Sequence, residues 1–202
     1  NKNIKIAFDE WNTYVEATPP YFIENYNIAD AIYAASLLNA CINRGDIITN
    51  TGIYHLINVM GNYRIEKKKI WKTPTTLVLE LYTKFHKGKI LKSVVNSSNF
   101  VSFKLGKQPE YKNNKLIDSA VTMNGKHMCM SVVNKSSSEK ILLKVPYLDR
   151  IAENYCIEGS NKVDLNTYEN TSRVKIKKNS LKTSKGFLIL PPHSISVVLF
   201  NI

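Results

Sequence analysis

The chain has 202 residues, of which 44% are hydrophobic, and a formal net charge of +12 at pH 7. This length suits one large or two modest domains, and the composition is that of a globular protein, which excludes a disordered one. The sequence lacks an apolar run of about 18 residues, so it predicts no membrane span. It opens on Asn1 rather than Met, so a signal peptide can be neither inferred nor excluded.

The positive charge is unevenly distributed along the chain. Residues 1–60 contain three basic and six acidic residues, so the basic excess lies in residues 61–202, mostly as scattered lysines with short runs at 67–69 and 175–178. A nucleic-acid-binding protein more typically presents an arginine-rich stripe or aromatic stacking residues. Solvated, lysine-rich faces explain this pattern better, and we expect no nucleic-acid partner.

The three cysteines are odd in number and widely separated, at Cys41, Cys129 and Cys156. A zinc site requires closer ligand spacing than this, so the sequence predicts no metal centre. Cys41 falls in a helical pattern and Cys129 in an alternating apolar run. We therefore expect buried free thiols.

The first predicted element is a buried strand at residues 4–8, Ile-Lys-Ile-Ala-Phe, which meets the polar segment 9–12, Asp-Glu-Trp-Asn. Residues 13–26 contain two consecutive prolines and are expected to form a long loop. A helix follows, because Asn27 and Asp30 have the spacing of a capping box and apolar residues recur at helical intervals over 28–42.

A second buried strand is predicted at residues 53–60, Ile-Tyr-His-Leu-Ile-Asn-Val-Met, and a second helix at 75–87, closed by Gly88. The order strand, helix, strand, helix over residues 4–87 is typical of parallel strands in an α/β sheet or barrel. Two such units cannot close a barrel by themselves.

From about residue 89 the pattern changes to short alternating runs without helices between them. The dipeptide Asn-Gly at 124–125 predicts a hairpin between two of these runs. Many short strands separated by turns favour an antiparallel β-sandwich. The expected strands lie at residues 100–105, 116–123, 127–134, 140–147, 172–177, 186–190 and 194–201.

The segment 9–12 has a composition suited to a functional site. In β/α barrels, functional side chains project from the C-terminal ends of strands. A carboxylate at such an end, beside an indole that can pack on a sugar face, suits carbohydrate chemistry. Taken alone, an Asp-Glu pair at a strand end more often forms a helix cap or a solvated turn.

The wider sequence resembles a known family. Residues 4–14 are similar to the nucleophile segment of the α-L-arabinofuranosidases of glycoside hydrolase family 51, in which a hydrophobic strand ends in Asp-Glu-Trp-Asn and an aromatic residue follows. The resemblance continues in the same order through residues 30–39, 56–59, 166–170 and 190–195, and so covers essentially the whole chain.

This resemblance implies a domain organisation and a function. Residues 1–88 would be the last two β/α units of a (β/α)8 catalytic barrel, and residues 89–202 a jelly-roll-like antiparallel β-sandwich. The chain would be the C-terminal part of a retaining exo-acting glycosidase that removes terminal non-reducing α-L-arabinofuranosides from arabinan or arabinoxylan oligosaccharides. The family implies an arabinose-containing oligosaccharide or polysaccharide as partner, a homo-oligomer, a cytoplasmic location, and neither a metal nor an organic cofactor.

The resemblance also assigns roles to five residues. Glu10 matches the catalytic nucleophile, which forms a covalent arabinofuranosyl intermediate in retaining enzymes. Trp11 and Asn12 would shape the substrate pocket, and Tyr14 would pack against the leaving-group sugar. His55 replaces a family glutamine that reaches the bound arabinose, and its ring can still offer one donor and one acceptor. A satisfied core histidine is the alternative for this residue.

Two further side chains have structural alternatives. Asp9 precedes Glu10 on the strand and should point to the opposite face, as structural support rather than a second catalyst. Trp71 follows the second strand and is expected to pack, or else to line the same cleft.

The catalytic machinery is incomplete in this sequence. The family's acid/base glutamate lies in a Gly-Asn-Glu motif on an earlier barrel strand, whereas the Gly-Asn here, at 61–62, is followed by Tyr63. We therefore expect this chain alone to be inactive. The alternative hypothesis is a non-catalytic module for carbohydrate binding or oligomer assembly. In either case, residues 1–88 should pack against the sandwich, against a second copy, or both.

Overall fold

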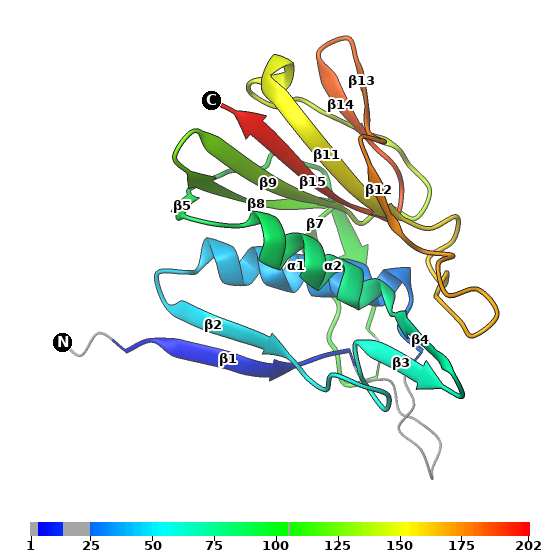
Figure 1. The fold of residues 1–202 in the computed structure, drawn as a ribbon. Helices are drawn as coiled ribbons and strands as arrows, with labels where there is room; N and C mark the ends of the chain where they lie inside the picture. Colours follow the sequence, from blue (N-terminus) through cyan, green and yellow to red (C-terminus); the bar gives the residue numbers. More distant parts are fainter. Residues whose placement is uncertain (1–3, 14–24, 105) are drawn as a thin grey trace.

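The computed structural model describes residues 4–13, 25–104 and 106–202. Within these ranges the chain forms fifteen strands, two α-helices and one turn of 3-10 helix, so it is mostly β-sheet. Helices α1 (Ile28–Asn43) and α2 (Pro74–Phe85) lie between a six-stranded sheet and the strand pair β1–β2 (Figure 1). Neither helix in these ranges is long and apolar enough to span a membrane.

The six-stranded sheet is antiparallel and forms the centre of the molecule. Its strands follow the order β12-β11-β15-β9-β8-β5. The predicted hairpin joins β8 to β9 through a two-residue turn in which Gly125 has a φ of +60°, a conformation that glycine adopts without strain. The bounds are β5 Lys89–Leu91, β8 Ile117–Asn124, β9 His127–Asn134, β11 Ile151–Glu158, β12 Ile176–Lys178 and β15 Ser194–Asn201.

A three-stranded sheet packs against one face of this central sheet. Its order is β10 (Ile141–Leu143), β14 (Phe187–Leu190), β13 (Lys182–Ser184). Alternate residues of β9 divide between two cores, because successive side chains of a strand point to opposite faces. Met130 and Val132 join the core between the sheets, whereas Cys129 and Val133 join the core beneath the helices. A third pair, β6 (Asn99–Ser102) and β7 (Tyr111–Lys115), forms a separate hairpin.

Strand β11 was not predicted, although it has eight residues and pairs with both β12 and β15. Its glutamates interrupt the apolar alternation that identifies a strand from sequence. Lysines of β12 pair with these carboxylates, Lys178 Nζ with Glu153 at 2.7 Å and Lys177 Nζ with Glu158 at 2.5 Å. The backbone ladder to β15 and these cross-strand pairs stabilise a strand that composition alone does not reveal.

Helix α1 begins as the sequence predicts. The Asn27 side chain accepts hydrogen bonds from the backbone of Ala29 and Asp30, and the Asp30 side chain accepts one from the backbone of Asn27, which completes the capping box. Helix α2 starts one residue earlier than expected because Thr73 caps it and Pro74 occupies the first turn.

The two helices pack on the central sheet and confirm the expectation that residues 1–88 contact the sandwich. Their inner faces share one core with β9, β11 and β15, and this core also includes Trp11 from β1. All three cysteines are buried and free, as predicted. Burial raises the pKa of Cys129 and of Cys156 to about 12, so these thiols stay protonated near neutral pH.

Strands β1 (Ile6–Trp11) and β2 (Ile48–Ile53) are parallel and are joined through α1. The prediction of a strand at 53–60 is wrong, because β2 ends at Ile53, where its ladder partner β1 also ends. The prediction that residues 4–8 are buried is wrong too, since Ile4 is 73% exposed and Ile6 47% exposed. Within the described residues, only Trp11 of β1 is buried. A hairpin of β3 (Tyr63–Glu66) and β4 (Lys69–Lys72) follows.

His86, at the end of α2, should make stability depend on pH. Burial lowers its pKa to about 4 from 6.5. Its Nδ1 lies 3.1 Å from the Thr122 hydroxyl, and its Nε2 has no partner among the described residues. Between pH 6.5 and 4 the unfolded chain binds a proton at His86 and the folded chain does not. The free energy of unfolding should therefore decrease as the pH is lowered through this range, by up to about 3 kcal/mol.

Urea denaturation across this pH range measures the effect. The His86→Gln variant keeps a hydrogen-bonding group but cannot titrate, so its free energy of unfolding should depend less on pH than that of the natural chain. Identical pH dependences would contradict the assignment.

Candidate functional site

Glu10 lies near the C-terminal end of β1, at an irregularity in the strand pairing. The register between β1 and β2 shifts between Phe8 and Trp11, so that Asp9 and Glu10 together lie opposite Gly52. A Cβ added to Gly52 would lie 3.3 Å from the carbonyl oxygen of Asp9, so glycine permits this close approach. Such bulges redirect side chains and are common beside active sites. Both carboxylates are exposed.

Asn12 follows β1 and holds the loop after β2. Its Nδ2 donates to the carbonyl oxygens of Tyr54, at 3.1 Å, and of Met60, at 2.9 Å, while its Oδ1 accepts from the backbone of Thr13. The side-chain amide thus spans the loop from one end to the other. The structure gives Asn12 this supporting contact, and its role in binding sugar stays a prediction.

His55 lies in the same loop, just beyond the end of β2. Because β1 and β2 are parallel, this loop and Glu10 lie at the same end of the strand pair. The His55 ring stacks on Tyr54, with ring centroids 3.8 Å apart and planes 27° apart. Its carbonyl oxygen accepts a hydrogen bond from Asn62 Nδ2 at 2.9 Å. His55 is only half-buried, so the structure does not support a core histidine here.

The two aromatic residues of the predicted site are placed differently. Trp11 is 5% exposed and packs in the core beneath the helices. Its indole N–H donates to the Thr51 hydroxyl at 2.6 Å. Trp11 therefore supports the site from within the fold, and contact with substrate stays a prediction. Tyr14 lies outside the described residues.

The loop at residues 54–62, which we call the His55 loop, has an unusual backbone. His55, Asn58 and Val59 have φ values of 61°, 49° and 50°, and a β-branched residue such as Val59 rarely adopts this left-handed region. A Cβ on Gly61 would lie 2.5 Å from the carbonyl carbon of Ile57 and would force the loop open. Strain of this kind persists only where surrounding contacts impose it, and it is concentrated at functional sites.

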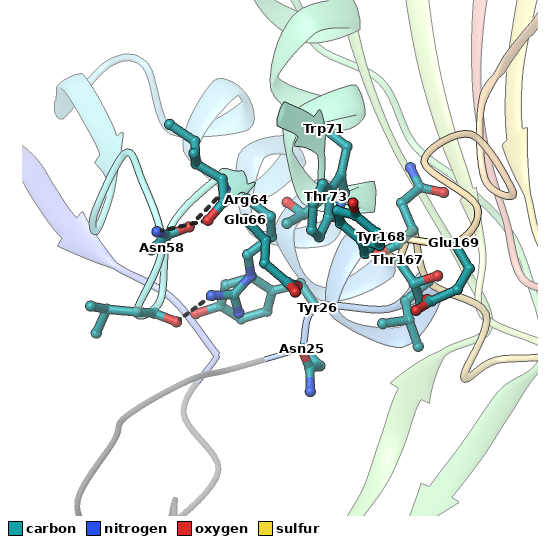
Figure 2. Close-up of a pocket in the computed structure, with 14 residues that line it drawn as sticks. Asn25, Tyr26, Asn58, Arg64, Glu66, Trp71, Thr73, Thr167, Tyr168 and Glu169 are labelled. Carbon is teal, nitrogen blue, oxygen red and sulfur yellow. Dashed lines mark hydrogen bonds between the residues drawn. The ribbon is translucent and has the colours of Figure 1, made fainter. Parts of the chain in front are cut away.

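A cavity of about 680 Å³ lies beside the His55 loop, between the β3–β4 hairpin and the loop that follows β11 (Figure 2). Trp71 lines it at 8% exposure, donates its indole N–H to the Asn166 carbonyl oxygen at 3.0 Å, and meets Tyr168 edge-on. The Lys69 ammonium lies 4.3 Å from the Tyr168 ring centroid. Trp71 thus both packs and lines a cavity, although Glu10 is not among the lining residues.

Sequence reasoning missed the asparagines that organise the His55 loop. Asn58 binds both backbone groups of Ile65 through its side chain, and Asn62 binds His55. The available signal was the tendency of asparagine to bond nearby backbone and to tolerate left-handed φ. An apolar run containing Leu56 concealed that signal.

The family model of the α-L-arabinofuranosidase C-terminal domain matches residues 9–194 of the chain. The chain belongs to this family. The match begins at the bulged end of β1 and runs through both helices to the first residue of β15, so the candidate site and most of the sandwich fall within one family domain.

Several arabinofuranosidases are similar to this chain. An intracellular exo-α-(1→5)-L-arabinofuranosidase from Streptomyces lividans is 25% identical over an alignment of 191 residues, which covers 86% of this chain and 28% of that enzyme. The α-L-arabinofuranosidase of Thermotoga maritima, solved as an arabinose complex, has a TM-score of 0.83 at 23% identity. The family 51 enzyme of Thermotoga petrophila RKU-1 has a TM-score of 0.84 at 25% identity.

The arabinofuranosidase domain described here is shorter than these relatives. It spans 28% of the Streptomyces enzyme. Each Thermotoga structure covers 98% of this chain, which in turn spans 43% of the Thermotoga chain. These relatives are glycoside hydrolases, and their additional length accounts for more than half of each.

Proposed function

We propose that this chain is the C-terminal part of a retaining exo-α-L-arabinofuranosidase. Residues 1–88 would supply the last two β/α units of its (β/α)8 barrel, and residues 89–202 its jelly-roll-like sandwich. The parallel pair β1–β2, connected through α1, supports the barrel interpretation. The observation that carries the proposal is the position of Glu10, at the bulged C-terminal end of β1 beside the His55 loop, in a domain of this family.

In this mechanism Glu10 attacks the anomeric carbon of a terminal arabinofuranoside. A second carboxyl group, supplied by a segment upstream of this chain, protonates the leaving oxygen as the glycosidic bond breaks. The same carboxylate then takes a proton from water, which attacks the arabinofuranosyl ester and releases Glu10. Two displacements at one carbon retain its configuration. His55 would hydrogen-bond the sugar, and Tyr14 would contact the leaving group.

The proposed substrate is an arabinose-containing oligosaccharide or polysaccharide with a non-reducing terminal arabinofuranosyl group. The Streptomyces relative is named as an intracellular exo-acting arabinofuranosidase, which supports this substrate class and a cytoplasmic location. Ile4 and Ile6 are exposed at the start of the strand pair, which supports further packing there by the upstream segment. Assembly of the whole enzyme into a homo-oligomer remains part of the proposal.

Covalent labelling tests the proposal. A 2-deoxy-2-fluoro arabinofuranoside with an activated leaving group slows hydrolysis of the glycosyl ester more than its formation. The polypeptide extended by its upstream segment should accumulate the label, and peptide mass spectrometry should find it on Glu10. Label on another carboxylate would refute Glu10 as the nucleophile. Turnover by the isolated chain would refute the need for a second carboxyl group from the upstream segment.

A further inference from the structure

Asparagine side chains hold the His55 loop at both ends. Asn12 binds the carbonyl oxygens of Tyr54 and Met60, and Asn62 Nδ2 donates to the carbonyl oxygen of His55 at 2.9 Å. These contacts fix a backbone that contains three left-handed non-glycine residues. The geometry of the loop therefore depends on what fixes the asparagines.

Asn62 is fixed by the start of α2. This residue is 5% exposed, and its carbonyl oxygen accepts a hydrogen bond from the backbone of Thr73 at 2.9 Å and another from the Thr76 hydroxyl. Thr73 is also the N-cap of α2. The position of the His55 carbonyl thus depends on the junction between β4 and α2.

Asn166 bonds that junction to the sandwich. It is 6% exposed and lies in the loop between β11 and β12. Its Nδ2 donates to the carbonyl oxygens of Lys72 and Val174, both at 2.9 Å, and its Oδ1 accepts from the Val174 backbone at 2.7 Å. Its own carbonyl oxygen accepts the Trp71 indole N–H. Both donors of Nδ2 are used and Oδ1 accepts one hydrogen bond, so the amide has a single orientation.

We propose that Asn166 is a positioning residue for His55, acting through Lys72, Thr73 and Asn62. This inference rests on the proposed function, in which His55 binds the sugar. A residue of the C-terminal sandwich would then help to set the substrate end of the β1–β2 pair, in addition to the packing of the sheet against the helices.

The test uses the Asn166→Ala variant of the full chain and two local measurements. The Tyr54 ring shifts the NMR signals of the His55 ring, and His55→Gln identifies these signals among the four histidines. In Asn166→Ala they should move toward the values of an unstacked histidine. Amide hydrogen exchange at Tyr54 and Tyr63 should become at least about tenfold faster, with exchange in β9 unchanged.

A matched control is available in the loop between β11 and β12, which also contains Asn166. Asn170 is exposed, and its side chain accepts from the Ser172 backbone at 3.3 Å, so Asn170→Ala should leave both measurements unchanged. Unchanged His55 signals in Asn166→Ala, or faster exchange spread equally over β9, would overturn the proposal. If Asn166→Ala does not fold, Asn166→Asp removes the donations to the Lys72 and Val174 carbonyl oxygens but keeps the acceptor for the Val174 backbone N–H, and the same two readouts decide.

Coupling between the two asparagines gives a second, independent readout. Asn62→Ala should affect the His55 signals as Asn166→Ala does, and the double variant should add little, because both residues act on one path. Fully additive effects would contradict the path. These measurements do not require Glu10 to be the nucleophile, so a failed labelling experiment and a failed positioning experiment are distinguishable.

Discussion

Replacing Glu10 with alanine should reduce hydrolysis of an aryl α-L-arabinofuranoside by roughly 10⁴- to 10⁶-fold in the polypeptide extended by its upstream segment. Losses of this size follow removal of a nucleophile that forms a covalent intermediate. Added azide, a small anion that fits the vacated space, should restore turnover and give a glycosyl azide of inverted configuration, because a single displacement replaces two. Rate measurements and the product's anomeric configuration provide the readout.

Asp9 is the matched control for Glu10. It is the adjacent carboxylate on the same strand, exposed at the same bulge. Asp9→Asn should lower the rate by less than about tenfold if Asp9 only supports the strand. A loss at Asp9 equal to that at Glu10, or near-natural activity of Glu10→Ala, would refute the assignment of the nucleophile.

Replacing Asn39 with leucine should lower the free energy of unfolding by about 3 kcal/mol, because several buried polar groups lose a partner at once. Asn39 is 1% exposed on the inner face of α1. Its Nδ2 donates to Asp118 at 2.6 Å, and its Oδ1 accepts from the Tyr82 hydroxyl at 2.8 Å and the Ser131 hydroxyl at 2.5 Å. Burial raises the pKa of Tyr82, so this phenol remains a donor.

Urea denaturation and thermal unfolding measure this effect, with an expected fall in Tm of about 6–12 °C for a chain of this size. Asn43, one helical turn later, makes one side-chain hydrogen bond, to the Ser119 carbonyl oxygen at 2.8 Å, and is exposed. Asn43→Leu should therefore cost less than about 1 kcal/mol. Equal losses at the two positions would show that the network around Asn39 contributes no more than a surface contact.

Local features of the fold were predictable from the sequence where the stabilising partners are neighbours in the chain. The capping box of Asn27 and Asp30 joins residues three positions apart, and the turn at Gly125 needs only its own flexibility and two flanking strands. Strands β9 and β15 were also identifiable, since each alternates side chains between two buried faces.

The apolar run at 53–60 illustrates what local pattern could not decide. A strand continues only while a neighbouring strand offers backbone hydrogen bonds. Strands β1 and β2 end together, at the paired residues Trp11 and Ile53. Beyond that point the side chain of Asn12 binds the backbone instead, and Leu56 remains 64% exposed. Strand β11 was missed for the converse reason, because partners distant in the sequence stabilise a segment of mixed polarity.

The sequence by itself determined the family of this chain, because an ordered series of motifs along the chain carries that information, and it predicted Glu10 and His55 as site residues. Only the tertiary structure showed that Asp9 and Glu10 lie at a bulge opposite Gly52 and that Trp11 belongs to the core. Only the tertiary structure connected Asn166 to the His55 loop. Each of these depends on contacts between residues far apart in the chain, which a local pattern does not specify.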